Sequence, residues 1–181
     1  MYNTTQDLLD GLGATGDTLQ GLVRGYGQEQ ARMARGGDEN WSVIEVICHL
    51  RDAEERSLER MRQMRDQERP LLAAYDQDQW AVERNYAGAD LHNALAAFLQ
   101  QRATYLAELA ALLPQAWMRQ GQHVEQGEIT IQSHALHMVS HDALHLAQIA
   151  RQLRAASPQR QGDVSIDNGA SALAGTMRPV T

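Results

Sequence analysis

The chain has 181 residues, enough to bury one hydrophobic core but too few for two domains to be expected. Its net charge of −7, with acidic and basic residues interleaved, excludes the clustered basic surface that binds nucleic acid. The single cysteine, Cys48, excludes an intramolecular disulfide, and no apolar run is long enough to span a membrane. Because the first residues also lack a basic and apolar leader, we expect a cytoplasmic protein that binds neither nucleic acid nor membrane.

Two amphipathic helices are predicted in the first third of the chain. The first covers roughly residues 4–26, where leucines recur at helical spacing, and a Gly-Gly-Asp-Glu-Asn stretch at 36–40 then interrupts the pattern. The second runs from Val43 to about Asp66. Ser42 and Glu45 have the spacing of a capping box, which predicts where this helix begins.

His49 lies inside the apolar face of the second predicted helix, together with Val46, Leu50 and Ala53. A histidine in such a position is either a hydrogen-bonded core residue or a ligand that faces a site. The sequence leaves both interpretations open.

The middle of the chain predicts a long connection and a third helix. Residues 69–89 are irregular, with at most one short helical turn. Asp90 then caps a helix from Leu91 to Leu113, and a polar connection follows at 117–128. No strand pattern is seen.

Four of the seven histidines gather in the last predicted helix, which covers 131–157 and is capped by Thr130. At 3.6 residues per turn, His134, His137 and His145 lie within about 40° of His141 around the helix axis. They form one imidazole stripe. Histidine is a mediocre helix former, so a stripe of this kind favours a metal site over an ordinary solvent face.

Four amphipathic helices predict an all-α four-helix bundle with long crossover connections. We expect the bundle domain to cover residues 1–156. Residues 157–181 are rich in Gly, Ser and Ala, and we expect a tail that is flexible or docked on a partner.

The candidate metal ligands are His49, His141 and His145. His141 and His145 have the i, i+4 spacing that lets two imidazoles bind one ion, and His49 on a facing helix is the candidate third ligand. Three imidazoles suit zinc or nickel, and iron or manganese less well. Such an ion activates a bound water or thiol. In the alternative interpretation each histidine is a satisfied core or surface residue.

Other residues are weaker candidates. His137 is the first candidate for an acid or base beside the site, although a surface role fits equally. His134 is expected at a pocket mouth or in solvent, and Asp142 is expected to orient a neighbour or contact another helix. The capping box accounts for Glu45, and the core accounts for Cys48. Asp52 and His123 are further candidates.

Three separated segments resemble the DinB-like family. Residues 41–54, WSVIEVICHLRDAE, resemble its W-S-x-x-E-V-x-x-H-L-x-D-x-E opening, and 141–149, HDALHLAQI, look like its H-D-x-x-H-x-x-Q-I signature. Between them, YDQDQW at 75–80 and RNY at 84–86 also agree. The likeness covers about residues 5–155.

The resemblance implies a four-helix bundle with a divalent metal held by three histidines, here His49, His141 and His145. It also implies a homodimer and a likeness to YfiT-type metal-dependent hydrolases and to S-transferases that use bacillithiol or mycothiol. The leading hypothesis is therefore a hydrolase or thiol transferase acting on a small electrophilic substrate, with a low-molecular-weight thiol as one cosubstrate. The alternatives are a non-catalytic metal-binding stress-response protein and a metal-free helical interaction scaffold.

Overall fold

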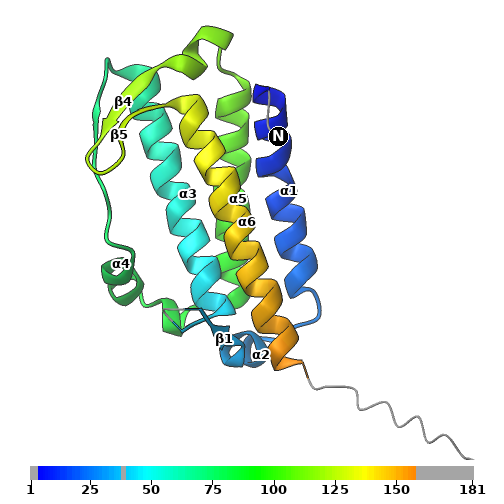
Figure 1. Ribbon diagram of the computed structural model, residues 1–181. Coiled ribbons are helices and arrows are strands. Elements are labelled where there is room, and N and C mark those ends of the chain that lie inside the picture. The colour runs from blue at the N-terminus through cyan, green and yellow to red at the C-terminus, as the bar shows by residue number, and fades with distance from the viewer. Residues whose placement is uncertain (1–3, 38–39, 158–181) are drawn as a thin grey trace, which may run out of the picture.

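The structure, a computed structural model, describes residues 4–37 and 40–157. Its four long helices are α1 (Thr5–Val23), α3 (Val43–Asp66), α5 (Leu91–Ala110) and α6 (Ile131–Ala156). They lie side by side as a four-helix bundle (Figure 1), which confirms the predicted fold class.

Side-chain caps set the beginnings of these helices. Ser42 and Glu45 form the predicted capping box, in which the Ser42 amide donates to Glu45 Oε2 at 2.7 Å, and Thr130 caps α6 as predicted. Two helices end earlier than predicted. α1 stops at Val23 because Gly25 adopts a positive φ of 84°, and a short helix, α2 (Gln28–Met33), follows. α5 stops at Ala110, three residues before Leu113, since the chain tightens there before the 3₁₀ segment η2 (Pro114–Met118).

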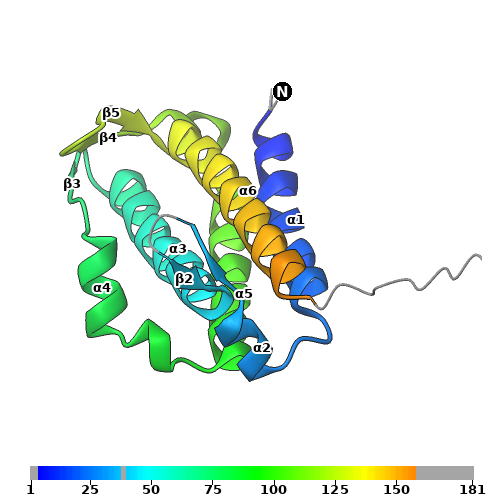
Figure 2. The same ribbon diagram turned by 60° about the horizontal axis from the view of Figure 1, so that its bottom comes forward.

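The helices α3 and α5 are neighbours that run in the same direction (Figure 1). The chain must therefore return along the outside of the bundle between them. This crossover carries β3 (Leu71–Leu72), the short helix α4 (Gln77–Glu83) and η1 (Tyr86–Gly88), and Figure 2 shows it standing away from the helices. It is the long connection predicted for residues 69–89.

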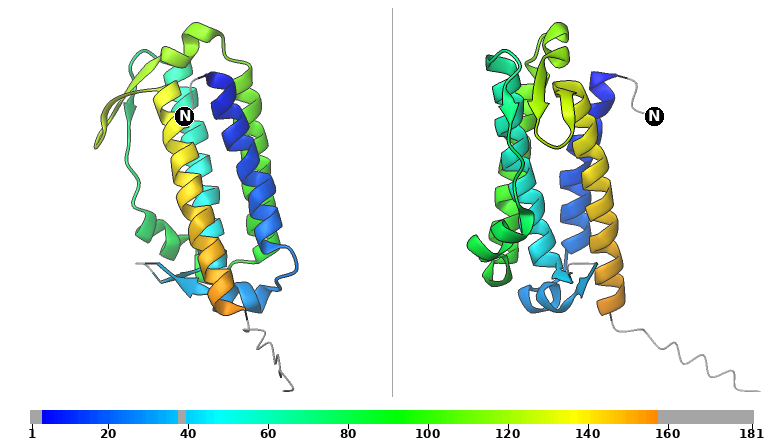
Figure 3. Two further views of the ribbon diagram at one scale, coloured as in Figure 1. Left: turned by 45° about the vertical axis from the view of Figure 1, so that its right-hand side comes forward. Right: turned by 60° about the vertical axis from the view of Figure 1, so that its left-hand side comes forward.

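Short strands occupy the connections, and the expectation of no strands was wrong there. β1 (Arg35–Gly36) pairs with β2 (Trp41–Ser42), and β4 (Gln120–His123) lies between β3 and β5 (Gly127–Thr130). β4 runs parallel to β3 and antiparallel to β5. Figure 3 shows the β4–β5 hairpin projecting beside the start of α6. Strands of two to four residues are too short to produce a readable alternation of apolar and polar residues.

The core divides into two apolar clusters. One contains Trp41, Ile44 and Phe98 and lies towards α2, whereas the other contains Met61 and Tyr105 and lies towards the β4–β5 hairpin. Polar side chains are buried between them, on the middle turns of all four helices. That polar layer belongs to the site described below.

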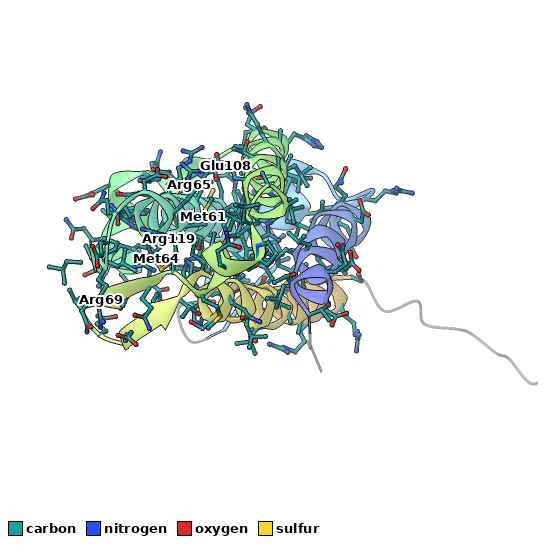
Figure 4. The ribbon with its side chains drawn as sticks, turned by 90° about the horizontal axis from the view of Figure 1, so that it is seen from above. Met61, Met64, Arg65, Arg69, Glu108 and Arg119 are labelled. Carbon is teal, nitrogen blue, oxygen red and sulfur yellow. The ribbon has the colours of Figure 1, made fainter. Side chains whose placement is uncertain are left out.

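Arginines connect the β4–β5 hairpin to the end of α3 (Figure 4). Arg119, which directly precedes β4, donates from Nε to the carbonyl of Met64 and from Nη2 to that of Gln67, both at 2.6 Å. These carbonyls lie at the end of α3, where a helix has no backbone donors left to offer. Arg69 also pairs with Glu128 of β5. The hairpin is thereby held against the end of α3.

Within the described residues, no helix is long and apolar enough to cross a membrane. The tail predicted at 157–181 lies outside the described residues from 158 onwards, so its role stays a prediction.

Candidate metal centre

His49 enters the interior of the bundle from α3, and only 2% of its surface is exposed. The indole of Trp41 packs beside its imidazole, with ring centroids 5.3 Å apart. Burial, assisted by the proximity of His141 and His145, lowers the pKa of His49 to about 3. The ring is therefore neutral at neutral pH, and one nitrogen lone pair is free to bind a ligand.

α6 brings His141 and His145 to the same point. The ring centroids of the three histidines lie 4.5–5.1 Å apart, and His49 Nε2 is 3.0 Å from His141 Nε2. One nitrogen from each ring can be chosen so that all three lie within 4.8 Å of one another. Ligands at a typical Zn–N distance in a tetrahedral site stand about 3.3 Å apart. The cluster therefore fits a divalent ion after only small side-chain adjustments.

Gln148 fixes the orientation of His145. Its Oε1 lies 2.8 Å from His145 Nδ1, which leaves Nε2 as the nitrogen able to bind an ion. Partners of this kind set the tautomer and raise the basicity of metal-binding histidines. The sequence reasoning missed this role, although the signal was present: Gln148 follows His145 by three residues, so the two share a helix face.

Asp142 lies beside the cluster and ties three helices together. Its Oδ2 accepts hydrogen bonds from Arg102 Nη1 on α5 at 2.7 Å and from Thr15 Oγ1 on α1 at 2.9 Å. Its Oδ1 lies 3.9 Å from His141 Nδ1. The expectation that Asp142 contacts another helix was correct.

Arg102 completes the buried polar layer. Its guanidinium donates two hydrogen bonds to Glu54 on α3, at 2.8 and 2.7 Å, and a third to the carbonyl of Leu12. Arg102, Glu54 and Asp142 are almost fully buried. This bidentate network, which the sequence reasoning did not identify, links all four helices next to the proposed ligands.

A cavity of about 230 Å³ opens beside the histidine cluster. His49 and His141 line one part of it. The rest is lined by side chains from α3, α6, the crossover and the β4–β5 turn, among them Arg60, Tyr75 and His123. An ion at the cluster would therefore have positions open towards a small molecule.

The other histidines of the stripe also reach this cavity. The His137 ring lies 6.2 Å from that of His141. His134 lines the cavity too, in agreement with one of its two expected places, but it is buried, so the alternative that it faces solvent was wrong. His123, a weak candidate from sequence, is buried in the cavity wall because the β4–β5 hairpin folds over the site.

The remaining candidates have structural roles. Glu45 caps α3 and pairs with Arg35 at 2.9 Å. Asp52 accepts a 2.6 Å hydrogen bond from Tyr86 Oη and is not part of the cavity wall. Cys48 is a core residue whose burial raises its thiol pKa to about 11.

Comparison with known proteins identifies the family. YfiT from Bacillus subtilis (strain 168), a probable metal-dependent hydrolase, is 29% identical over 113 residues, which make up 62% of this chain and 64% of YfiT. The chain thus matches less than two thirds of that relative's length. The solved structure of YfiT, described as an unusual four-helix bundle topology, matches with a TM-score of 0.78 at 23% identity, over 86% of this chain and 89% of that chain. This likeness shows the fold. Residues 12–149, most of the bundle, match the DinB superfamily, and the chain belongs to that family.

Proposed function

We propose that the protein is a divalent-metal-dependent enzyme that acts on a small electrophilic molecule. One observation carries the proposal: three histidines from two helices converge beside a cavity, with ligand atoms within 4.8 Å of one another. The relative YfiT, a probable metal-dependent hydrolase, supports the same class of activity.

In this proposal His49, His141 and His145 bind the ion. A divalent ion held by these three imidazoles would supply Lewis acidity and lower the pKa of a bound water or thiol. Zinc or nickel suits these ligands best, and iron(II) or manganese is the alternative. Gln148 orients His145, while the Asp142–Arg102–Glu54 network keeps α6 in register with α3.

His137 is the proposed acid or base. It lines the cavity within one turn of His141, and its pKa is lowered by burial and by the nearby His141 and Arg60. A neutral imidazole at neutral pH can accept a proton from the attacking water or thiol. It can then return that proton to a leaving group.

The nucleophile decides between two reactions. Attack by water makes the protein a hydrolase, whereas attack by a bacillithiol- or mycothiol-type thiol makes it an S-transferase. The name of YfiT favours the hydrolase, and the DinB-like resemblance accommodates both. We further propose a cytoplasmic homodimer that takes a small-molecule substrate and binds no nucleic acid.

Elemental analysis tests the metal site first. Protein purified without a histidine tag should carry about one zinc, nickel or other divalent ion per chain. His49→Ala, His141→Ala and His145→Ala should each lose it, and His92→Ala, an exposed residue of α5, should keep it. An undiminished metal content in the His141→Ala variant would overturn the ligand assignment.

The alternative function, a metal-free helical scaffold, is favoured by the 3.0 Å contact between His49 Nε2 and His141 Nε2, which one shared proton can bridge. That contact leaves the convergence of His145 unexplained. The scaffold would contain no ion and would take up none at neutral pH.

A non-catalytic protein with a structural metal is a further alternative. It differs from the proposed enzyme in its ligands, because a closed zinc site takes four protein ligands. Among the described residues, only these three histidines form such a group here.

A further inference from the structure

Arg60 is a buried cation without a carboxylate partner among the described residues. Its surface is 8% exposed, its Nη2 donates to the carbonyl of Ala73 at 2.6 Å, and its Nε has no hydrogen-bond acceptor. A guanidinium stays protonated at any physiological pH. Burying it without a counter-charge costs on the order of several kcal/mol. Arg60 therefore holds a positive charge and an Nε–H donor that no described residue pairs with.

Arg102 shows how this chain satisfies an arginine for purely structural reasons. It is more deeply buried than Arg60, and its guanidinium pairs with Glu54 and Asp142 and also binds the Leu12 carbonyl. Arg60 has one backbone carbonyl and faces the cavity. The difference indicates that the anion for Arg60 comes from outside the chain.

His123 supplies a second unmatched donor to the same cavity. The backbone amides of Glu125 and Gln126 both donate to its Nδ1, at 3.2 and 3.3 Å. A neutral imidazole whose Nδ1 accepts must carry its proton on Nε2. That Nε2 is buried and has no partner. The β4–β5 turn thus holds His123, a residue of the cavity wall, as a hydrogen-bond donor without a partner among the described residues.

We propose that Arg60 and His123 form an oxyanion subsite, which binds a carboxylate or phosphate group of the molecule that reacts at the histidine cluster. The guanidinium provides charge and the imidazole N–H provides direction, the combination with which proteins recognise such groups. Identifying the bound group as part of a substrate rests on the proposed function. Anion binding itself does not require the ion.

The helix geometry separates this subsite from the proposed metal site. On α3, His49, Ala53, Ser57 and Arg60 line the cavity in sequence, and Arg60 is eleven residues beyond His49, about 16 Å along the axis. The arginine side chain shortens this gap. The cavity therefore selects a molecule whose anionic group lies several bonds away from its electrophilic atom.

One acidic residue, Glu125, also lines the cavity, but it is exposed and makes no ion pair with Arg60. Its negative charge opposes the entry of an anion. Removing that charge in Glu125→Gln should therefore strengthen anion binding relative to the wild type.

The test titrates the full chain, stripped of metal with a chelator, with sodium acetate and separately with inorganic phosphate at constant ionic strength. NMR of the Arg60 Nε–H and His123 Nε2–H groups should show saturable shifts with at least one anion. A response to acetate alone assigns a carboxylate, and a response to phosphate alone assigns a phosphate ester. Arg60→Gln should weaken the affinity at least tenfold, whereas Arg62→Gln, an exposed arginine on the same helix, should leave it unchanged.

Saturation in neither titration, or an anion affinity in Arg60→Gln equal to that of the wild type, would overturn the subsite. Arg60 would then have only a structural role, as the donor to the Ala73 carbonyl. If Arg60→Gln does not fold, His123→Leu replaces it and should show the same weakening. Metal content measured in parallel separates the two proposals. Metal retained without anion binding refutes only the subsite, and anion binding without metal refutes only the metal enzyme.

Discussion

The four histidines of α6 have similar positions on the helix but different surroundings. His145 is oriented by Gln148, His141 lies beside Asp142, His134 is buried without a partner at Nε2, and His137 lines the open part of the cavity. Single residues next to these imidazoles therefore set how each ring is held.

Gln148→Ala should weaken metal binding without removing the site. Losing the partner of a metal-binding histidine typically reduces metal affinity about 10–100-fold, because the ring is no longer held in one tautomer and orientation. Competition with a chromophoric zinc chelator measures this change. Gln132→Ala, one glutamine earlier on α6, is the matched control. Equal zinc affinity in both variants would show that Gln148 does not position His145.

His134 should make the metal-free protein sensitive to acid. Burial lowers its pKa to about 3, so below the unfolded pKa of about 6.5 the unfolded chain binds a proton that the folded chain refuses. The free energy of unfolding therefore falls as the pH drops from about 6.5 towards 3, and His134 does not affect it above that window. One proton contributes a slope of about 1.4 kcal/mol per pH unit.

His134→Gln should remove that share of the slope. Urea denaturation of the metal-free protein at pH 7, 6, 5 and 4.5 measures it. His92→Gln, at an exposed position on α5, should retain the wild-type slope. A wild-type slope in His134→Gln would contradict the neutral, buried state of this residue.

At the scale of elements, the polar layer between the two apolar clusters holds the helices in register. Arg102 contacts α1, α3 and α6 at once. Arg102→Leu should lower the free energy of unfolding by about 3–5 kcal/mol, because Glu54 and Asp142 would remain buried without their cation. Denaturant unfolding checks this value.

Arg65→Leu is the control for that prediction. Arg65 pairs with Glu108 and Asp66 at the partly exposed surface of α3, where an ion pair contributes about 1 kcal/mol or less. A similar loss of stability in both variants would mean that the buried network is no more important than a surface pair. In Arg102→Leu, metal affinity should also fall, because Asp142 would lose its anchor beside His141.

The helices were predictable from sequence because their signals are local. The capping box of Ser42 and the i, i+4 pair His141 and His145 need only neighbouring residues, and His49 stood out as a histidine among apolar residues. That Arg60 and His123 line one cavity depends on the hairpin folding over α3. Such contacts have no local pattern. The strands of the crossover and hairpin were missed because segments of two to four residues show no readable alternation of apolar and polar residues.

At the scale of the whole molecule, the proposed ion joins elements that are far apart in the chain. His49 on α3 and His141 on α6 are separated by 92 residues, so an ion bound to both would bind the folded state and not the unfolded chain. Zinc buffered at about 100 times its dissociation constant should raise the free energy of unfolding by about 2.7 kcal/mol. His141→Ala should show no such increase, and His92→Ala should show all of it.

The same measurement separates the metal enzyme from the scaffold. In a scaffold, the contact between His49 and His141 stabilises the metal-free fold, so His141→Ala should destabilise the metal-free protein while zinc leaves the wild type unchanged. In a metal enzyme, the closeness of the three imidazoles contributes little to the stability of the metal-free wild type. Removing His141 then changes the metal-free stability little and abolishes the response to zinc. The two unfolding curves, with and without zinc, therefore distinguish the functions before any substrate is known.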